Sequence, residues 1–284
     1  MDFPIYEVDQ GIGYIPRASQ EGSFLNRFSW KVNEKNMAAG SWAPNQKPDL
    51  LLIGDSIVWG GEDYRHEEKL GSALQDCLPH WSVWSVGASS WSIPNEVEYL
   101  RRNPEVVEAT ELVIWVLNSG DFLSKTQFLT DANTPRSRPW SANLYAIRKY
   151  ILPTGFKKWL RSLVNRIRPS QESAPSDPAV VEDQLAEAVD ALSAKGKPVL
   201  ILAYPSLSEL ASGRANERGV RTEYEKLLSR LEKIKNPGTK VVDGCHLKGW
   251  GPEDYGDPIH PTPNGNRRLG AALAGLVQGI QGSK

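Results

Sequence analysis

The sequence predicts an α/β fold in which a central, parallel five-stranded sheet is covered by helices on both faces. Three observations predict it: short apolar runs, amphipathic runs of helical period between them, and small or polar residues where the first three apolar runs end. Strands this short and this apolar are typical of sheets that are buried on both faces. Their alternation with helices favours a parallel sheet, because parallel neighbours need long crossover connections.

The predicted strands are residues 49–53, 81–86, 112–117, 198–204 and 240–242. The predicted helices are residues 67–77, 95–102, 179–194, 222–234 and 264–278. The first strand ends at Gly54, the second at Gly87 and the third in the sequence Asn118-Ser119-Gly120-Asp121. Sites in open parallel sheets form at the carboxyl ends of the strands, so these three ends are where we expect chemistry.

Two regions do not follow the alternation of strands and helices. Residues 1–48 carry Gly, Pro, Asn and aromatic residues without a clear period, which predicts an irregular lead-in packed on a domain of residues 49–284. Residues 122–178 form an insertion, in which residues 154–168 have one apolar and one cationic face and residues 169–178 resemble a linker. The amphipathic segment either lies apolar side down on the core or forms a lid that contacts an anionic polysaccharide or a membrane.

The composition is that of an ordinary globular protein. The 284 residues suffice for one large α/β domain or two small ones. A net charge of −1 gives no overall field that favours nucleic acid or a membrane surface. The two cysteines, Cys77 and Cys245, exclude a disulfide-stapled scaffold and lack zinc-site spacing. We interpret them as isolated buried thiols; the alternative is one bridge between them.

The sequence contains no recognisable signal for export or membrane insertion. No apolar run approaches the roughly 20 residues of a membrane span, and the N-terminus lacks the basic and apolar regions of a signal peptide. Taken literally, the chain is predicted to be cytoplasmic. A chain trimmed of its export segment would look the same and would be periplasmic or secreted.

Ser56 is the first candidate for chemistry, because it directly follows the first predicted strand in the sequence Gly54-Asp55-Ser56. A helix that begins there has unpaired backbone N–H groups, which favour negative charge. A serine in this place can attack a carbonyl and stabilise the resulting oxyanion with its own N–H. The structural alternative is a plain helix cap, and we expect Asp55 to be structural, bonded to neighbouring backbone.

Asp257 and His260, near the other end of the chain, are the second candidate. A serine hydroxyl needs a base, and histidine titrates near neutral pH. The histidine in turn needs an acceptor for its other ring nitrogen, which an acid three residues earlier can reach across a tight turn stiffened by Pro258 and Pro261. His260 is the one histidine that combines an acid at this spacing with a rigid frame. The other three are expected to be surface or hydrogen-bonded side chains: His66, His80 and His246.

Together, the two ends of the chain resemble a known family. Gly54-Asp55-Ser56 and Asp257-x-x-His260 resemble the first and last sequence blocks of the SGNH/GDSL hydrolases. Gly87, within Val86-Gly87-Ala88 at the second strand end, resembles the glycine block of that family. A glycine there lets a backbone N–H approach the reacting carbonyl without a Cβ in the way; the alternative is a simple turn glycine.

The third block of the sequence departs from the family pattern. The family usually has Gly-x-Asn-Asp, in which the asparagine side chain donates to the oxyanion. Alignment on the acid puts Gly120 at the asparagine position, whereas alignment on the amide makes Asn118 the donor, two residues early. We expect Asn118, because the chemistry needs an amide donor. The alternative is that Asn118 shapes the turn, and that Gly87 and Ser56 suffice.

The resemblance implies a three-layer α/β/α, flavodoxin-like fold and a serine esterase that hydrolyses acyl esters, with acetyl as the expected group. It implies a catalytic triad of Ser56, His260 and Asp257, and an oxyanion hole made by Ser56, Gly87 and Asn118. It implies no metal and no organic cofactor. The partner would be a small ester or an acylated glycan, with no nucleic acid involved.

Two other functions stay open at this level. The lead-in, with Gly11-Ile12-Gly13-Tyr14 and Asn33, also resembles the N-terminal stretch of SGNH proteins linked to bacterial polysaccharide O-acylation, which would make the chain an acyltransferase. The unusual third block would also suit a glycan-binding module that kept the fold and lost catalysis.

Overall fold

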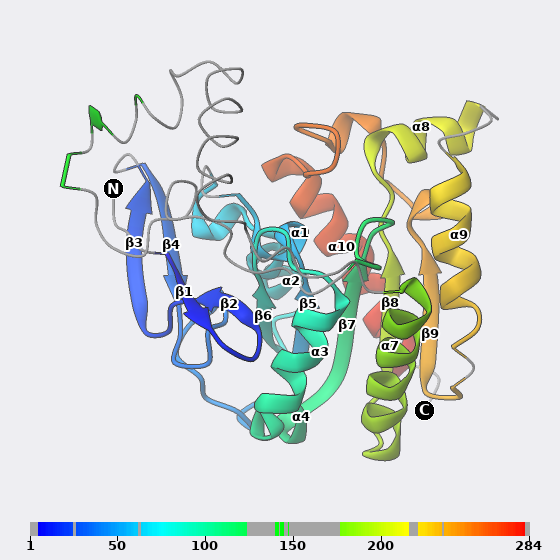
Figure 1. The fold of residues 1–284 in the computed structure, drawn as a ribbon, viewed down its shortest axis with the longest axis horizontal. Helices are drawn as coiled ribbons and strands as arrows, with labels where there is room; N and C mark the ends of the chain where they lie inside the picture. Colours follow the sequence, from blue (N-terminus) through cyan, green and yellow to red (C-terminus); the bar gives the residue numbers. More distant parts are fainter. Residues whose placement is uncertain are drawn as a thin grey trace, which may run out of the picture.

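The computed structural model describes residues 5–24, 27–61, 64–123, 177–215, 221–234 and 236–281, together with residues 140, 141, 143, 144 and 147. Its centre is a parallel five-stranded sheet with the strand order β6-β5-β7-β8-β9 (Figure 1). The strands are β5 (Asp49–Gly54), β6 (Ser82–Gly87), β7 (Thr110–Leu117), β8 (Val199–Ala203) and β9 (Thr239–Asp243). All five predicted strands are confirmed, with ends that differ by one or two residues.

Helices cover both faces of the sheet, so the predicted three-layer α/β/α fold is confirmed. Leu51 and Ile53 of β5 pack into one apolar core, and Leu50 and Leu52 pack into the other. The first core is covered by α3 (Ile93–Arg102), α4 (Pro104–Ala109), α7 (Pro178–Ala194) and α9 (Arg221–Leu231). The second is covered by α1 (Ser56–Trp59), α2 (Leu70–Cys77), α8 (Leu207–Ala215) and α10 (Pro263–Gln281). Figure 1 shows α3, α4 and α7 in front of the sheet and α10 behind it.

Several helix boundaries differ from those predicted. The predicted helix 67–77 is a 3-10 turn, His66–Glu68, followed by α2, which begins at Leu70. The predicted helix 222–234 ends at Leu231. Among the described helices, α1 begins at Ser56, where a helix was expected to follow the first strand. Two others, α4 and α8, were not predicted, because six and nine residues are too few for a period of 3.6 to stand out.

The prediction of an irregular lead-in is wrong for residues 5–32, whereas residues 33–48 contain no helix or strand. Residues 5–32 contain two antiparallel pairs: β1 (Tyr6–Asp9) with β2 (Gly13–Pro16), and β3 (Gln20–Phe24) with β4 (Phe28–Val32). Asp9 organises the first turn, because its Oδ1 accepts hydrogen bonds from the N–H groups of Gly11 and Ile12. Gly13 follows with a φ of 98°, a left-handed conformation that glycine adopts without strain. These strands were missed because they lack the apolar runs of the central sheet: β1 reads YEVD and β3 reads QEGSF.

The insertion lies largely outside the described residues, and with it the predicted amphipathic segment 154–168 and nearly all of the predicted linker 169–178. At the end of that linker, Asp177 caps α7 by accepting a hydrogen bond from Ala179 N, and Pro178 is the first residue of the helix. Among the described helices, none combines the length and the apolar character that a bilayer crossing requires.

Candidate active site

Three side chains from opposite ends of the chain meet at the carboxyl end of β5. The ring Nε2 of His260 lies 2.9 Å from the hydroxyl Oγ of Ser56, although 204 residues separate the two along the chain. The ring Nδ1 lies 2.7 Å from a carboxylate oxygen of Asp257. This geometry is that of a nucleophile, a base and a carboxylate that orients the base.

Ser56 is placed by the junction of β5 and α1. Asp55 is the N-cap of α1 and accepts a hydrogen bond of 2.8 Å from the N–H of Ile57, so the cap leaves the Ser56 N–H to other partners. Gly54 permits the close packing behind the serine, because a Cβ there would lie 2.9 Å from the carbonyl oxygen of Val116. The expectation that Asp55 is bonded to neighbouring backbone is confirmed.

The loop that carries His260 is stabilised by hydrogen bonds to the Asp257 carboxylate. One oxygen of Asp257 accepts hydrogen bonds from the N–H groups of Ile259 and His260, and the other contacts the imidazole. Burial by itself raises the pKa of Asp257, but these hydrogen bonds outweigh it and bring that pKa below its ordinary value. Asp257 therefore keeps its negative charge next to the imidazole through the neutral range, which suits a group that stabilises an imidazolium.

Two tyrosines that were not predicted as site residues bind the backbone of the same loop. Tyr64 donates to the carbonyl of Pro261 at 2.7 Å, and Tyr204 donates to the carbonyl of Ile259 at 2.8 Å. Both bonds run from a side chain to a backbone oxygen that is far away in sequence, so no local motif encodes them. They fix the backbone on both sides of His260.

A second Asp-x-x-His pair lies at the end of β9, so spacing alone does not single out His260. The ring Nδ1 of His246 lies 2.7 Å from Asp243, as in the first pair. The His246 side chain is 81% exposed, however, and Asp243 is also engaged by the hydroxyl of Tyr224. Among the described residues, no serine hydroxyl meets His246. His246 is therefore a surface histidine, as expected.

One of the remaining histidines departs from expectation. His66 is half-buried, and one of its two ring nitrogens, Nδ1, is buried without a hydrogen-bond partner among the described residues. Burial lowers the pKa of His66, which keeps the ring neutral. His80 is exposed, as expected.

The structure gives a packing reason for a glycine at position 87. Gly87 lies beside Gly54 in the parallel register of β5 and β6. A Cβ at Gly87 would lie 2.6 Å from the carbonyl oxygen of Gly54 and 2.7 Å from that of Asp55. The close approach of the two strands therefore requires a glycine here. That approach puts the backbone of Gly87 next to the residues that precede Ser56.

The expectation that the Asn118 side chain donates to an oxyanion is contradicted. The Asn118 amide nitrogen donates to Asp55 at 3.1 Å and to Asp121 at 3.0 Å, which uses both of its hydrogens. The amide oxygen accepts from the N–H of Gly120 at 2.7 Å. Asn118 thus shapes the turn after β7, as the alternative prediction had it. The remaining predicted donors are the backbone N–H groups of Ser56 and Gly87.

Three buried carboxyl groups lie near the end of β7: Asp55 and Asp121 contact the Asn118 amide, and Glu96 contacts Trp115. Burial raises the pKa of Asp55 to about 6, although the Ile57 N–H, His260 and Asn118 all lower it. Burial, followed by the charges of Asp55 and Glu96, raises the pKa of Asp121 well above its usual range. Glu96 accepts a hydrogen bond from the indole of Trp115 at 2.6 Å, and burial raises its pKa to about 8. Glu96 therefore retains its proton at neutral pH.

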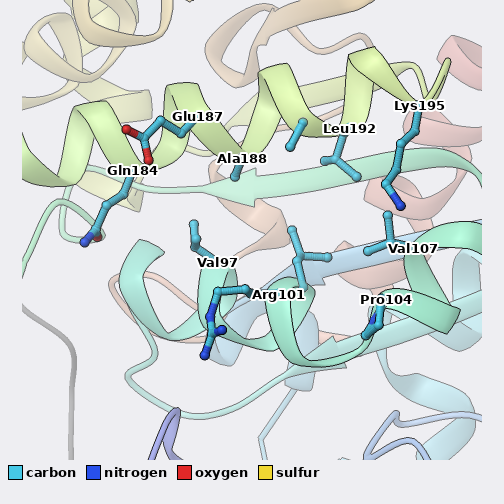
Figure 2. Close-up of a pocket in the computed structure, with 11 residues that line it drawn as sticks. Val97, Arg101, Pro104, Val107, Gln184, Glu187, Ala188, Leu192 and Lys195 are labelled. Atoms are coloured by element: carbon cyan, nitrogen blue, oxygen red, sulfur yellow. The ribbon is translucent and has the colours of Figure 1, made fainter.

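A groove elsewhere on the surface does not belong to this site. It measures 340 Å³ and lies between α3 and α4 on one side and α7 on the other (Figure 2). Apolar side chains such as Val97 and Leu192 line it, and Arg101 and Lys195 stand at its rim. It contains none of the three triad residues.

The described residues contain no group of three or more His, Cys, Asp or Glu side chains arranged to hold a metal ion. Cys77 and Cys245 are both free thiols, as predicted. Both side chains are half-buried, whereas buried side chains were predicted.

Comparison with known proteins shows similarity in structure. No family model and no curated protein matches the sequence. A solved α/β hydrolase enzyme from the metagenome of Lake Arreo in Spain is 16% identical, with a TM-score of 0.51 over 82% of this chain and 95% of that one. That similarity shows the fold.

Two further solved structures are similar at lower TM-scores. One is a member of the lipolytic G-D-S-L family from Veillonella parvula, 14% identical, with a TM-score of 0.43 over 80% of this chain and 96% of that one. The other is the acetyl xylan esterase AlAXEase, 12% identical, with a TM-score of 0.46 over 81% of this chain and 99% of that one.

Proposed function

We propose that this chain is a serine ester hydrolase of the SGNH/GDSL type that acts through an acyl-enzyme on Ser56. The observation that carries the proposal is the continuous contact from the Ser56 hydroxyl to His260, at 2.9 Å, and on to Asp257, at 2.7 Å. The sequence blocks around these residues and the three-layer fold support the same conclusion.

In the proposed reaction, His260 takes the hydroxyl proton of Ser56 as the oxygen attacks an ester carbonyl. Asp257 holds the imidazole in the tautomer whose Nε2 can accept that proton, and then stabilises the imidazolium. Collapse of the tetrahedral intermediate returns the proton to the leaving alcohol and leaves the acyl group on Ser56. A water molecule, deprotonated by His260, then releases the carboxylic acid.

The oxyanion is received by the backbone N–H groups of Ser56 and Gly87 in this proposal. Ser56 is the first residue of α1, where N–H groups lack intrahelical partners. Asn118 has no part in it, because its amide hydrogens are used by two carboxyl groups. Two donors instead of three imply a lower rate for the chemical step, since one donor is worth roughly 10²–10³ in kcat.

The exposure of the site bears on the size of the alcohol that it can accept. The side chain of Asp257 is 50% exposed and that of His260 is 32% exposed, so the triad lies at the surface and can receive a bulky alcohol. We propose acyl esters of a small alcohol or of a glycan, with acetyl as the acyl group. A glycan hydroxyl in place of water would make the same site an acyltransferase.

Labelling with a fluorophosphonate probe tests the nucleophile. The native chain should take up one probe molecule on Ser56, and Ser56→Ala should abolish both labelling and hydrolysis of p-nitrophenyl acetate while the fold survives. Ser208→Ala is the matched control, because Ser208 is an exposed serine on α8 whose loss should change neither readout. Labelling of the Ser56→Ala variant at the native level would refute the assignment.

Hydrolase and transferase are separated by an acceptor experiment. Turnover of an acetyl donor is measured with and without a polysaccharide, and products are identified by mass spectrometry. Free acetate as the main product supports the hydrolase, and acetylated glycan supports the transferase. Failure of the native chain to label would favour the binding module that lost catalysis.

A further inference from the structure

The lead-in does more than cover the core, because its first hairpin contacts the segment that ends β6 and continues beyond it. That segment, Gly87-Ala88-Ser89-Ser90, begins with a proposed oxyanion donor. Ala88 is fully buried and Ser89 is half-buried. The contacts to this segment come from β1 and β2, which precede it by more than 70 residues.

The hydroxyl groups of Tyr6 and Tyr14 both form hydrogen bonds with Ser89. The hydroxyl of Tyr6 lies 3.1 Å from the Ser89 hydroxyl and also accepts a hydrogen bond from the Ser89 N–H at 3.4 Å. The hydroxyl of Tyr14 donates to the Ser89 carbonyl oxygen. The N–H, the carbonyl and the side chain of one residue are thus all engaged by the hairpin.

The backbone of the segment needs such support. Ser90 has a φ of 64°, a left-handed conformation that is costly for a residue with a Cβ. Strained conformations of this kind persist only where the surrounding structure over-determines them, and they gather at functional sites. Here the strained residue comes directly after the one that the tyrosines hold.

The hairpin itself is fixed to the body of the domain. Asn95 of α3 donates to the carbonyl of Ile12 at 2.6 Å, and the indole of Trp91 donates to the carbonyl of Tyr14 at 2.8 Å. Arg102 pairs with Asp9 at the turn. Because both strands of the hairpin and the turn are anchored, the tyrosine hydroxyls are held in fixed positions.

We propose that Tyr6 and Tyr14 are positioning residues of the active site. They fix Ser89 and, two residues earlier, the peptide of Gly87, so that the Gly87 N–H is held ready beside Ser56 before a substrate arrives. The inference rests on the proposed esterase function for its catalytic consequence, whereas its structural part can be measured without a substrate. An oxyanion donor must be preorganised to contribute fully, because reorganisation during the reaction costs rate.

The test removes only the two hydroxyl groups. Tyr6→Phe combined with Tyr14→Phe keeps the buried rings and should lower kcat for p-nitrophenyl acetate about 10- to 100-fold, less than loss of a whole donor, with KM nearly unchanged. The matched control is Tyr99→Phe, since Tyr99 also donates to a backbone carbonyl of the lead-in, that of Lys35, at 2.8 Å. The control variant should keep the native kcat.

A second measurement reads the segment itself. Hydrogen exchange of residues 84–91 in the free protein should be faster in the double variant and unchanged in Tyr99→Phe. Unchanged exchange and an unchanged kcat would overturn the positioning role. Faster exchange with an unchanged kcat would overturn the catalytic part. A native chain that neither labels nor hydrolyses esters would refute the proposed function and the catalytic role of the two tyrosines. The structural role of the tyrosines would still be decided by hydrogen exchange.

Discussion

The substitution Gly87→Ala adds one carbon atom where two parallel strands lie close together. The added Cβ would lie 2.6 Å from the carbonyl oxygen of Gly54 and 2.7 Å from that of Asp55, both of them backbone atoms. Backbone cannot rotate away as a side chain can. The ends of β5 and β6 must therefore separate, and these are the ends that carry Ser56 and the Gly87 N–H.

The size of the effect follows from the geometry. The strands must separate by roughly half an ångström before carbon and oxygen reach a tolerable distance. Overpacking of this kind costs about 1–3 kcal/mol of folding free energy, which lowers Tm by roughly 2–10 °C in a domain of this size. A misplacement of about half an ångström at a reacting centre costs roughly tenfold in kcat.

Thermal unfolding and steady-state hydrolysis of p-nitrophenyl acetate are the two assays. The matched control is Gly275→Ala on α10, where a Cβ would meet nothing within 4 Å. That variant should be more stable by roughly 0.5–1 kcal/mol, because alanine favours the helix over glycine, and its kcat should be native. A Gly87→Ala variant with native Tm and native kcat would refute the packing argument. A lower Tm with native kcat would refute the role of Gly87 in the reaction.

Three further predictions concern the charged and reactive side chains. Asp257→Asn should lower kcat about 10²–10⁴-fold by destabilising the correct imidazole tautomer, with little change in Tm because the carboxylate is 50% exposed; a native kcat in steady-state assays would show that His260 needs no acid. Glu96 has a pKa raised from 4.5 to about 8 in the folded state, so the folded chain keeps a proton that the unfolded chain loses, and stability falls as the pH rises through that window. Glu96→Gln should therefore flatten the dependence of Tm on pH, raising Tm relative to the native chain more at about pH 8 than at about pH 5; parallel Tm curves would contradict it. Denatured, unreduced protein should take up two iodoacetamide groups, on Cys77 and Cys245, by intact mass, and uptake of none would reveal a disulfide.

The sequence was sufficient for the features that depend on neighbours along the chain. The strand of β5 was predictable because every residue of Asp49–Gly54 is buried, so the whole run is apolar apart from its ends. The pairing of Asp257 with His260 was predictable because three residues across a tight turn bring the two side chains within reach. The resemblance of these blocks to a family then linked them with Ser56.

The features that sequence reasoning missed are contacts between distant segments. The same Asp-x-x-His spacing recurs at Asp243 and His246, and only the fold decides which histidine meets a serine. The orientation of the Asn118 side-chain amide depends on its hydrogen bonds to Asp55 and Asp121, and Asp55 lies 63 residues away in sequence. An alignment of residue types could not have revealed that its hydrogens are already used.

The sequence by itself determined the order of strands and helices, the glycine and serine at the end of β5, and the acid that orients His260. These follow from hydrophobic period and local spacing, which act over a few residues. Only the tertiary structure decided that Ser56 and His260 meet, that Gly87 is required by strand packing, and that a hairpin of the lead-in holds Ser89. The physical reason is that strand register and layer packing set these distances, and both arise from the summed burial of the whole core.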